Sequence, residues 1–164
     1  GGFELSCSRC AEFDRDVKFI VHKFYVKIMG TGCFVDICQN SKRAIFAGTL
    51  KAGGLKESVE GGTIRIRQEG KFIKAVEKVP EITFNGRNAV ARGQEVVIIT
   101  ERAVFRLAEQ GVVLTEIAPG MDLEQDIIDQ MAFRPIISEN LKEMDHRLFQ
   151  EEAMGLRRTQ FHLE

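Results

Sequence analysis

The sequence predicts an α/β fold with a central apolar sheet, an antiparallel meander and C-terminal helices. Residues 43–49 and 95–100 are compact apolar runs of strand length, which is typical of buried strands. Between residues 55 and 84, apolar and polar side chains alternate between glycine turns, as expected of an antiparallel sheet with one face in solvent. Apolar residues at helical spacing follow later in the chain, at Leu123, Ile127, Ile128 and Met131.

The composition is that of one globular domain, which we expect to span residues 1–164. The chain has 164 residues, of which 44% are hydrophobic and 29% are charged. Its net charge of -1, without a long run of like charges, argues against nucleic acid or an anionic membrane as a partner. The sequence contains no apolar run of about 18 residues and no signal-peptide pattern, so we expect a cytoplasmic protein without a membrane span.

The first 40 residues predict two strands followed by a glycine-rich turn. Residues 4–8 and 17–24 are apolar stretches of strand length, and the turn-like Asp14-Arg15-Asp16 separates them. Gly30 and Gly32 begin the next segment, which we expect to open a short helix.

The alternating region predicts the meander. Residues 55–59 and 63–67 flank the turn at Gly61 and Gly62, and residues 72–75 and 79–84 continue the pattern. A short helix should follow between Asn85 and Gly93, because asparagine and glycine are preferred caps at the two helix ends.

The last third of the chain predicts a hairpin and two helices. The hairpin joins residues 103–107 to residues 112–117. Asp122 has the position of a helix N-cap, with Gln125 as its capping-box partner. We expect a second helix over residues 140–152 and a frayed tail from Arg157 onward.

Four blocks of sequence resemble the family I CoA-transferases of the acetate/propionate and acetoacetyl type. They read GTGCFVDICQN at residues 30–40, AIFAGT at 44–49, TERAVF at 100–105 and EIAPGMDL at 116–123. The resemblance is to the C-terminal part of that family and is strongest over residues 30–150. It implies a partial CoA-transferase-like domain of the NagB/RpiA-like kind.

The resemblance also implies a binding site for coenzyme A or an acyl-CoA. In the family, the glycine turn and the strand after it flank that site, which implies the lining residues Gly30, Gly32, Phe34, Asn40, Gly48 and Thr49. Glycine lets the backbone approach a ligand closely, and amides that open a helix can bind an anion. Cys33 stands where the family has a second glycine, so a structural turn without a ligand is the alternative interpretation.

Family members use a glutamate in a glycine-rich loop as the nucleophile, and we expect this chain to lack that loop. Glu60 before Gly61-Gly62 imitates it, but a tip between two alternating strands is a hairpin turn and offers no oxyanion donors. The sequence therefore predicts no catalytic residue, no required cofactor and a chain that is inactive alone. Alternatives are a subunit that completes a split active site with a partner chain, and a structural or interaction module. A sheet edge left open by the partial domain would favour a homo-oligomer, most simply a dimer.

Other polar residues give weaker signals. The pairs Cys7/Cys10 and Cys33/Cys38 resemble halves of a zinc site, but buried thiols also behave as small apolar side chains, and we predict no metal site. The histidines at positions 22, 146 and 162 show no ligand spacing. Glu101-Arg102 at a strand end is interpreted as a surface ion pair with a structural role, and the alternative is that it faces the site.

Overall fold

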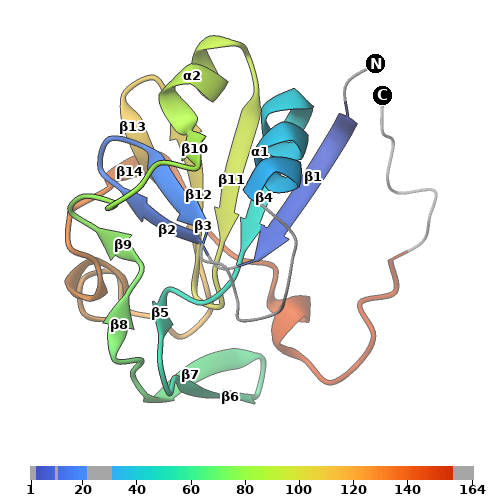
Figure 1. Ribbon diagram of the computed structural model, residues 1–164. Helices are drawn as coiled ribbons and strands as arrows, with labels where there is room; N and C mark the ends of the chain where they lie inside the picture. Colours follow the sequence, from blue (N-terminus) through green and yellow to red (C-terminus); the bar gives the residue numbers. More distant parts are fainter. Residues whose placement is uncertain (1–2, 10, 22–30, 157–164) are drawn as a thin grey trace.

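The computed structural model describes residues 3–9, 11–21 and 31–156 (Figure 1). A six-stranded sheet forms its centre, in the order β1-β4-β11-β12-β13-β14. Its first three strands run parallel, β12 is antiparallel to both of its neighbours, and β14 is parallel to β13. The strand bounds are β1 (Phe3–Arg9), β4 (Ser41–Ala47), β11 (Glu95–Ile99), β12 (Ala103–Ala108), β13 (Gly111–Ile117) and β14 (Ile136–Glu143). The two predicted apolar strands and the predicted hairpin are therefore confirmed.

A smaller four-stranded sheet packs against one face of the central sheet. It contains β2 (Ala11–Asp14), β3 (Lys18–Val21), β9 (Ala75–Val76) and β10 (Phe84–Asn85). Phe19 of this sheet stacks on Phe46 of the central sheet, with ring centroids 4.6 Å apart. Buried phenylalanines from both sheets thus form the core that lies between them.

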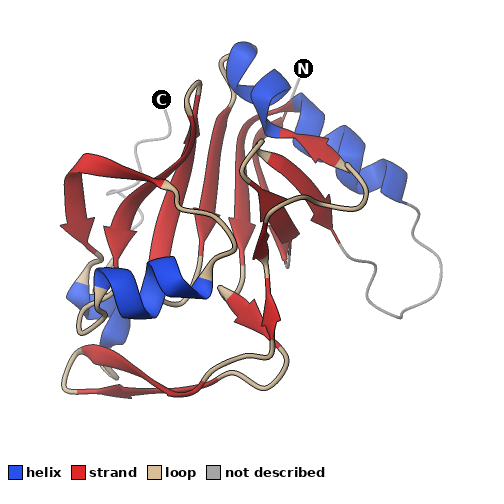
Figure 2. Cartoon of the chain, turned by 90° about the vertical axis from the view of Figure 1, so that its left-hand side faces the viewer, coloured by secondary structure: helices blue, strands red, loops and turns tan. Residues whose placement is uncertain are grey.

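Two short ribbons extend beyond the core, as Figures 1 and 2 show from two sides. One pairs β5 (Lys51–Ala52) with β8 (Phe72–Ile73), and the other is the hairpin of β6 (Lys56–Glu60) and β7 (Thr63–Gln68). The hairpin confirms the first half of the predicted meander. The second half is different, because β9 pairs with β2 and residues 79–83 form no strand.

Residues 79–83 depart from the predicted meander partly because Asp14 binds the start of this segment. Its carboxylate is buried and accepts hydrogen bonds from the amides of Lys18 and Val79, at 3.0 and 3.1 Å. The amide of Thr83 donates to the carbonyl of Phe19 at 2.8 Å. Backbone amides after β9 therefore find their hydrogen-bond acceptors in the β2–β3 unit, which is distant in the sequence, rather than in a neighbouring strand.

Within the described ranges, two α-helices accompany the sheets. α1 (Thr31–Asn40) leads directly into β4, and α2 (Gly86–Ala91) leads toward β11. The caps of α2 are those that the sequence predicted, since Asn85 accepts from the Asn88 amide and Gly93 has a φ of +76°. Gly86 also lets the helix backbone lie close to Val17, because a Cβ at position 86 would lie 2.6 Å from the Val17 carbonyl oxygen.

The C-terminal helices are shorter than predicted. They are a π-helical turn (Leu123–Ile127) and two 3₁₀ turns (Ile128–Gln130 and His146–Phe149). The predicted helix over residues 140–152 is wrong for its first part, which belongs to β14, and is helical only at the second 3₁₀ turn. Parallel pairing with β13 decides this segment, so tertiary contacts override its helical periodicity.

The N-cap of the π-helical turn is confirmed, but its capping box is not. Asp122 Oδ1 accepts from the amides of Glu124 and Gln125, at 3.0 and 2.8 Å. In the reciprocal bond, the Asp122 amide donates to the Asp126 carboxylate at 2.7 Å, instead of to the Gln125 side chain. Because the π-helical turn is wider than an α-helical turn, Asp126, one position after Gln125, lies within hydrogen-bond distance of the Asp122 amide.

Replacing Asp122 with alanine should lower the free energy of unfolding by about 1 kcal/mol, because two amides lose their acceptor. Urea denaturation followed by circular dichroism measures this change. Gln125→Ala is the matched control and should change stability by less than about 0.5 kcal/mol. An equal loss in both variants would mean that Gln125, and not Asp126, completes the cap.

Several predictions fall on residues outside the described ranges, namely those on His22, His162, Cys10 and the tail from Arg157. Among the described residues, Cys38 is a buried cysteine, and no helix is long and apolar enough to cross a membrane.

Candidate functional site

The candidate site lies at the carboxyl ends of β4 and β11, two neighbouring parallel strands. Gly48 and Thr49 follow β4, and Thr100 and Glu101 follow β11. The two ends are joined directly, because the Gly48 amide donates to the carbonyl of Ile99 at 3.0 Å. In open α/β sheets, ligands bind outside the carboxyl ends of the strands.

A small cavity opens among these residues. Its polar lining comes from Thr49, Lys74 and Thr100 together with the backbone at Gly48, and its apolar walls include Phe46. Its volume is about 10 Å³, close to the least that one water molecule needs. The described residues therefore form a polar niche, whereas a complete pocket for an organic ligand measures roughly 300 to 1,000 Å³.

Lys74 is the charged group of this niche. Its side chain is buried, with 7% of the residue exposed, and its Nζ donates to Thr49 Oγ1 at 3.0 Å. The Lys74 carbonyl accepts from the Phe13 amide at 2.9 Å, which anchors this residue to the small sheet. A buried ammonium beside a hydroxyl suits an anionic oxygen, such as that of a carboxylate or a phosphate. Sequence reasoning missed Lys74, because only the long-range pairing of β9 with β2 brings it to the site.

Glu101 and Arg102 form a buried network instead of the predicted surface pair. The Arg102 side chain is 0% exposed, and that of Glu101 is 10% exposed. Arg102 Nε donates to Glu101 Oε1 at 2.6 Å, and Arg102 Nη1 donates to Glu69 Oε1 at 2.7 Å. Arg102 Nη1 also donates to the carbonyl of Asp126 at 3.1 Å. The small stabilisation expected of a solvent-exposed ion pair therefore does not apply to this arginine. Removing one partner of a buried pair leaves the other charge buried without compensation.

The same network keeps Arg102 charged. Burial alone would lower the pKa of this guanidinium, but hydrogen bonding and the charges of Glu69 and Glu101 outweigh it and raise the pKa above its ordinary value. Arg102 is thus a permanent cation beside the site, and its guanidinium donates to protein groups.

The structure brings together only some of the residues that the resemblance implies. Gly48 and Thr49 lie in the niche, whereas Gly30 is outside the described ranges. Gly32 and Phe34 belong to the first turns of α1, which begins at the end of the sheet where β4 finishes (Figure 1). The predicted glycine turn is thus largely helix.

Asn40 lies at the opposite end of β4 from the niche. β4 is seven residues long, so Asn40 and Gly48 are separated by roughly 25 Å at about 3.3 Å per residue. Asn40 Nδ2 donates to the carbonyl of Asp36 at 2.8 Å, which completes the C-terminal end of α1. Its predicted place beside Thr49 therefore receives no support from the geometry.

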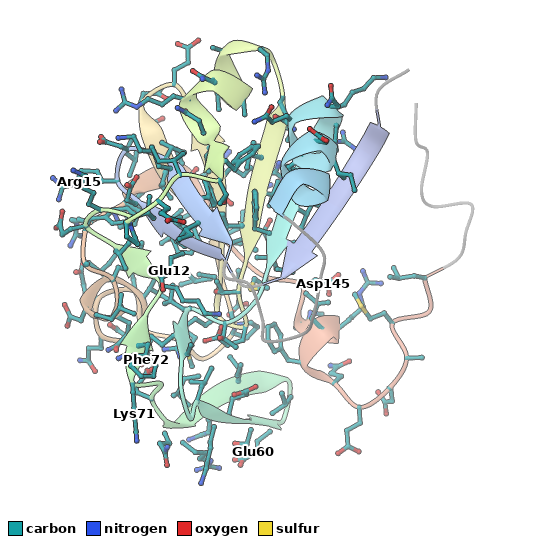
Figure 3. The ribbon with its side chains drawn as sticks, in the orientation of Figure 1. Glu12, Arg15, Glu60, Lys71, Phe72 and Asp145 are labelled. Atoms are coloured by element: carbon teal, nitrogen blue, oxygen red, sulfur yellow. The ribbon has the colours of Figure 1, made fainter. Side chains whose placement is uncertain are left out.

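Glu60 lies at the hairpin tip, as predicted, and away from the strand ends (Figure 3). It pairs with Arg67 and with Arg65. The hydrogen bonds from Arg67 and Ser58 lower the pKa of the Glu60 carboxyl. The turn itself is made by Gly61 and Gly62, whose φ angles are +59° and +79°. Glu60 is accordingly an exposed, ion-paired turn residue.

Comparison with known proteins finds similar CoA-transferases, although no protein-family model matches the sequence. The chain is 52% identical to acetate CoA-transferase YdiF of Escherichia coli (strain K12) over 155 residues, which cover 94% of this chain and 29% of YdiF. It is 38% identical to the caffeate CoA-transferase of Acetobacterium woodii over 161 residues, or 95% of this chain and 30% of that enzyme.

The fold agrees with a solved structure of the same kind. The acyl-CoA transferase YdiF of E. coli O157:H7, solved as a thioester complex with CoA, matches with a TM-score of 0.87 and 51% identity. The match covers 94% of this chain and 30% of that one. The chain is therefore homologous to a part of these CoA-transferases and spans about three tenths of their length.

Proposed function

We propose that this chain forms the part of a CoA-transferase active site that binds coenzyme A or an acyl-CoA. The binding edge is the carboxyl end of β4 and β11, with Gly48 and Thr49 in contact with the ligand and Lys74 behind them. The observation that carries the proposal is the partly buried Lys74–Thr49 hydrogen bond at 3.0 Å, located at that edge. The relatives, an acetate CoA-transferase and a caffeate CoA-transferase, support the choice of ligand.

Each residue of the niche has a physical task. Gly48 carries no side chain, so a ligand can lie against the backbone. Thr49 Oγ1 accepts from the Lys74 ammonium, which leaves the hydroxyl proton to donate to an oxygen of the ligand. The ammonium polarises that hydroxyl and favours a negative charge on the bound oxygen. Gly32 and Phe34, which belong to the first turns of α1, and Gly30 remain proposed lining residues.

The chain alone is proposed to bind and not to catalyse. The covalent step of the family needs a glutamate, and we propose that this carboxylate comes from polypeptide outside these 164 residues. It would meet the niche either within a longer chain or in a cytoplasmic complex, and no further cofactor is required.

A second candidate is a non-catalytic interaction module that assembles as a homo-dimer. β1 is an edge strand that pairs only with β4 among the described strands, and Phe72 is 65% exposed on β8. An open sheet edge and an exposed aromatic side chain are features that a protein partner can cover. This candidate needs no small ligand, so a binding measurement separates the two.

Calorimetric titration with coenzyme A and acetyl-CoA tests the proposal. We expect saturable heat for the unmodified chain and a Kd that rises about 3- to 10-fold in Thr49→Val, which removes one hydrogen-bonding hydroxyl. Thr115→Val is the matched control, because the Thr115 hydroxyl donates to the Val104 carbonyl at 3.1 Å, within the sheet. Absence of heat at millimolar coenzyme A would reject the proposal and leave the interaction module.

A further inference from the structure

Arg102 is held by its neighbour Glu101 and by two segments that are distant in the sequence. Its guanidinium donates to Glu101 after β11, to both carboxylate oxygens of Glu69 after β7, and to the Asp126 carbonyl in the π-helical turn. The distances to the Glu69 oxygens are 2.7 and 3.3 Å. Because the guanidinium is planar and its donors have a fixed geometry, these acceptors determine its orientation.

Glu101 transmits that orientation to the binding edge. Its two carboxylate oxygens have different tasks: Oε1 accepts from Arg102 Nε at 2.6 Å, and Oε2 accepts from the Leu50 amide at 2.8 Å. Leu50 is fully buried and directly follows Gly48 and Thr49. The turn is thus bonded to β11 on both sides of Thr49, at the Gly48 amide and at the Leu50 amide.

We propose that Arg102 is a positioning residue for the ligand-binding turn at residues 48–50, acting through Glu101. This inference rests on the proposed function, because the turn is the proposed ligand contact. Neither Arg102 nor Glu101 is assigned a ligand contact of its own. Arg102 fixes the rotation of the Glu101 carboxylate so that one oxygen faces the Leu50 amide. The amide then holds the turn in the position in which Thr49 meets Lys74.

Two features distinguish positioning from a purely structural role. The network contains one bond that reaches the turn, from Leu50 to Glu101, so weakening that bond should loosen residues 48–50 more than the rest of the chain. The other bonds of Arg102 go to Glu69 and to the Asp126 carbonyl, and a Glu101 variant leaves these partners in place. Ligand affinity should therefore change in Glu101 variants whose overall fold is intact.

The test uses Glu101→Gln in the full chain, with Arg102→Lys as a second variant. Glutamine has an NH2 group in place of one carboxylate oxygen, so one of the two donors, the Leu50 amide or Arg102 Nε, would face another donor instead of an acceptor. We expect hydrogen exchange of the Leu50 amide to become about tenfold faster and the Kd for coenzyme A to rise about tenfold, the effect of one lost charge-assisted bond. Arg102→Lys keeps the cation without its fixed geometry and should show smaller changes in the same direction.

The controls are a residue and a variant away from the site. The Gln94 amide, which donates to the Ala89 carbonyl at 3.0 Å, should exchange at an unchanged rate. Glu124→Gln breaks the exposed pair with Arg134 and should change neither Leu50 exchange nor the Kd.

Each outcome decides the inference. Unchanged Leu50 exchange in both variants would overturn it, and so would faster exchange with an unchanged Kd in chains that are folded by circular dichroism. Lack of coenzyme A binding by the unmodified chain would remove the proposed function and the ligand part of this inference. The Leu50 exchange rate would still decide, independently, whether Glu101 and Arg102 hold the turn.

Discussion

Arg102→Met is expected to lower the free energy of unfolding by about 3 to 5 kcal/mol, because it removes one partner of a buried charge network. Methionine fills similar volume but offers no donor to Glu101 or to Glu69. The Glu101 carboxylate, whose side chain is 10% exposed, would then lose the cation that compensates its burial. The Asp126 carbonyl would lose its hydrogen bond from the guanidinium as well.

Urea denaturation at neutral pH measures this loss. Arg134→Met is the matched control, because Arg134 forms a two-bond pair with Glu124 in which both side chains are more than half exposed, at 58% and 54%. Exposed pairs contribute about 0 to 1 kcal/mol, so the control should stay within that range. Similar losses in the two variants would show that burial of Arg102 has no special effect on stability.

Phe19→Ala is expected to lower the free energy of unfolding by about 3 to 5 kcal/mol, as large-to-small changes of buried aromatic residues do. Phe19 is 0% exposed and lies between the two sheets. Its ring stacks on Phe46 at 4.6 Å and meets the edge of Phe84 at 5.5 Å. The substitution would leave a cavity between the sheets. The neighbouring rings of Phe46 and Phe84 belong to different sheets, so they can fill this cavity only if the two sheets move closer together.

The matched control for this prediction is Phe72→Ala. Phe72 is 65% exposed, so its truncation removes little buried surface and should change stability by less than about 0.5 kcal/mol. The measurement is the urea midpoint with the slope of the transition compared among the variants. A loss below about 1 kcal/mol in Phe19→Ala would mean that the two sheets do not share one cooperative core.

Local features of the fold could be predicted from the sequence because they depend on neighbouring residues. The apolar runs that became β4 and β11, the hairpin through Gly61 and Gly62, and the caps at Asn85 and Asp122 are all confirmed. Turn and cap chemistry acts within four residues, so the local sequence contains the relevant information.

Features that depend on distant partners could not be predicted in this way. Residues 140–143 have helical periodicity but form part of β14, because β13 offers a strand to pair with. Residues 79–83 leave the meander because Asp14 and Phe19 bind their backbone. In both cases the deciding contact joins residues that are far apart in the sequence, so a pattern of neighbouring residues does not reveal it.

Four blocks of the sequence indicated the similarity to CoA-transferases and the local elements that those blocks contain. Only the tertiary structure decided that Arg102 is buried, that Lys74 meets Thr49 and that Asn40 lies at the far end of β4. The physical reason is that burial and the meeting of charges depend on strand order and register, which join β9 to β2 and β4 to β11. Residue type and spacing determine which groups are present, and the pairing of distant strands determines which of them act together.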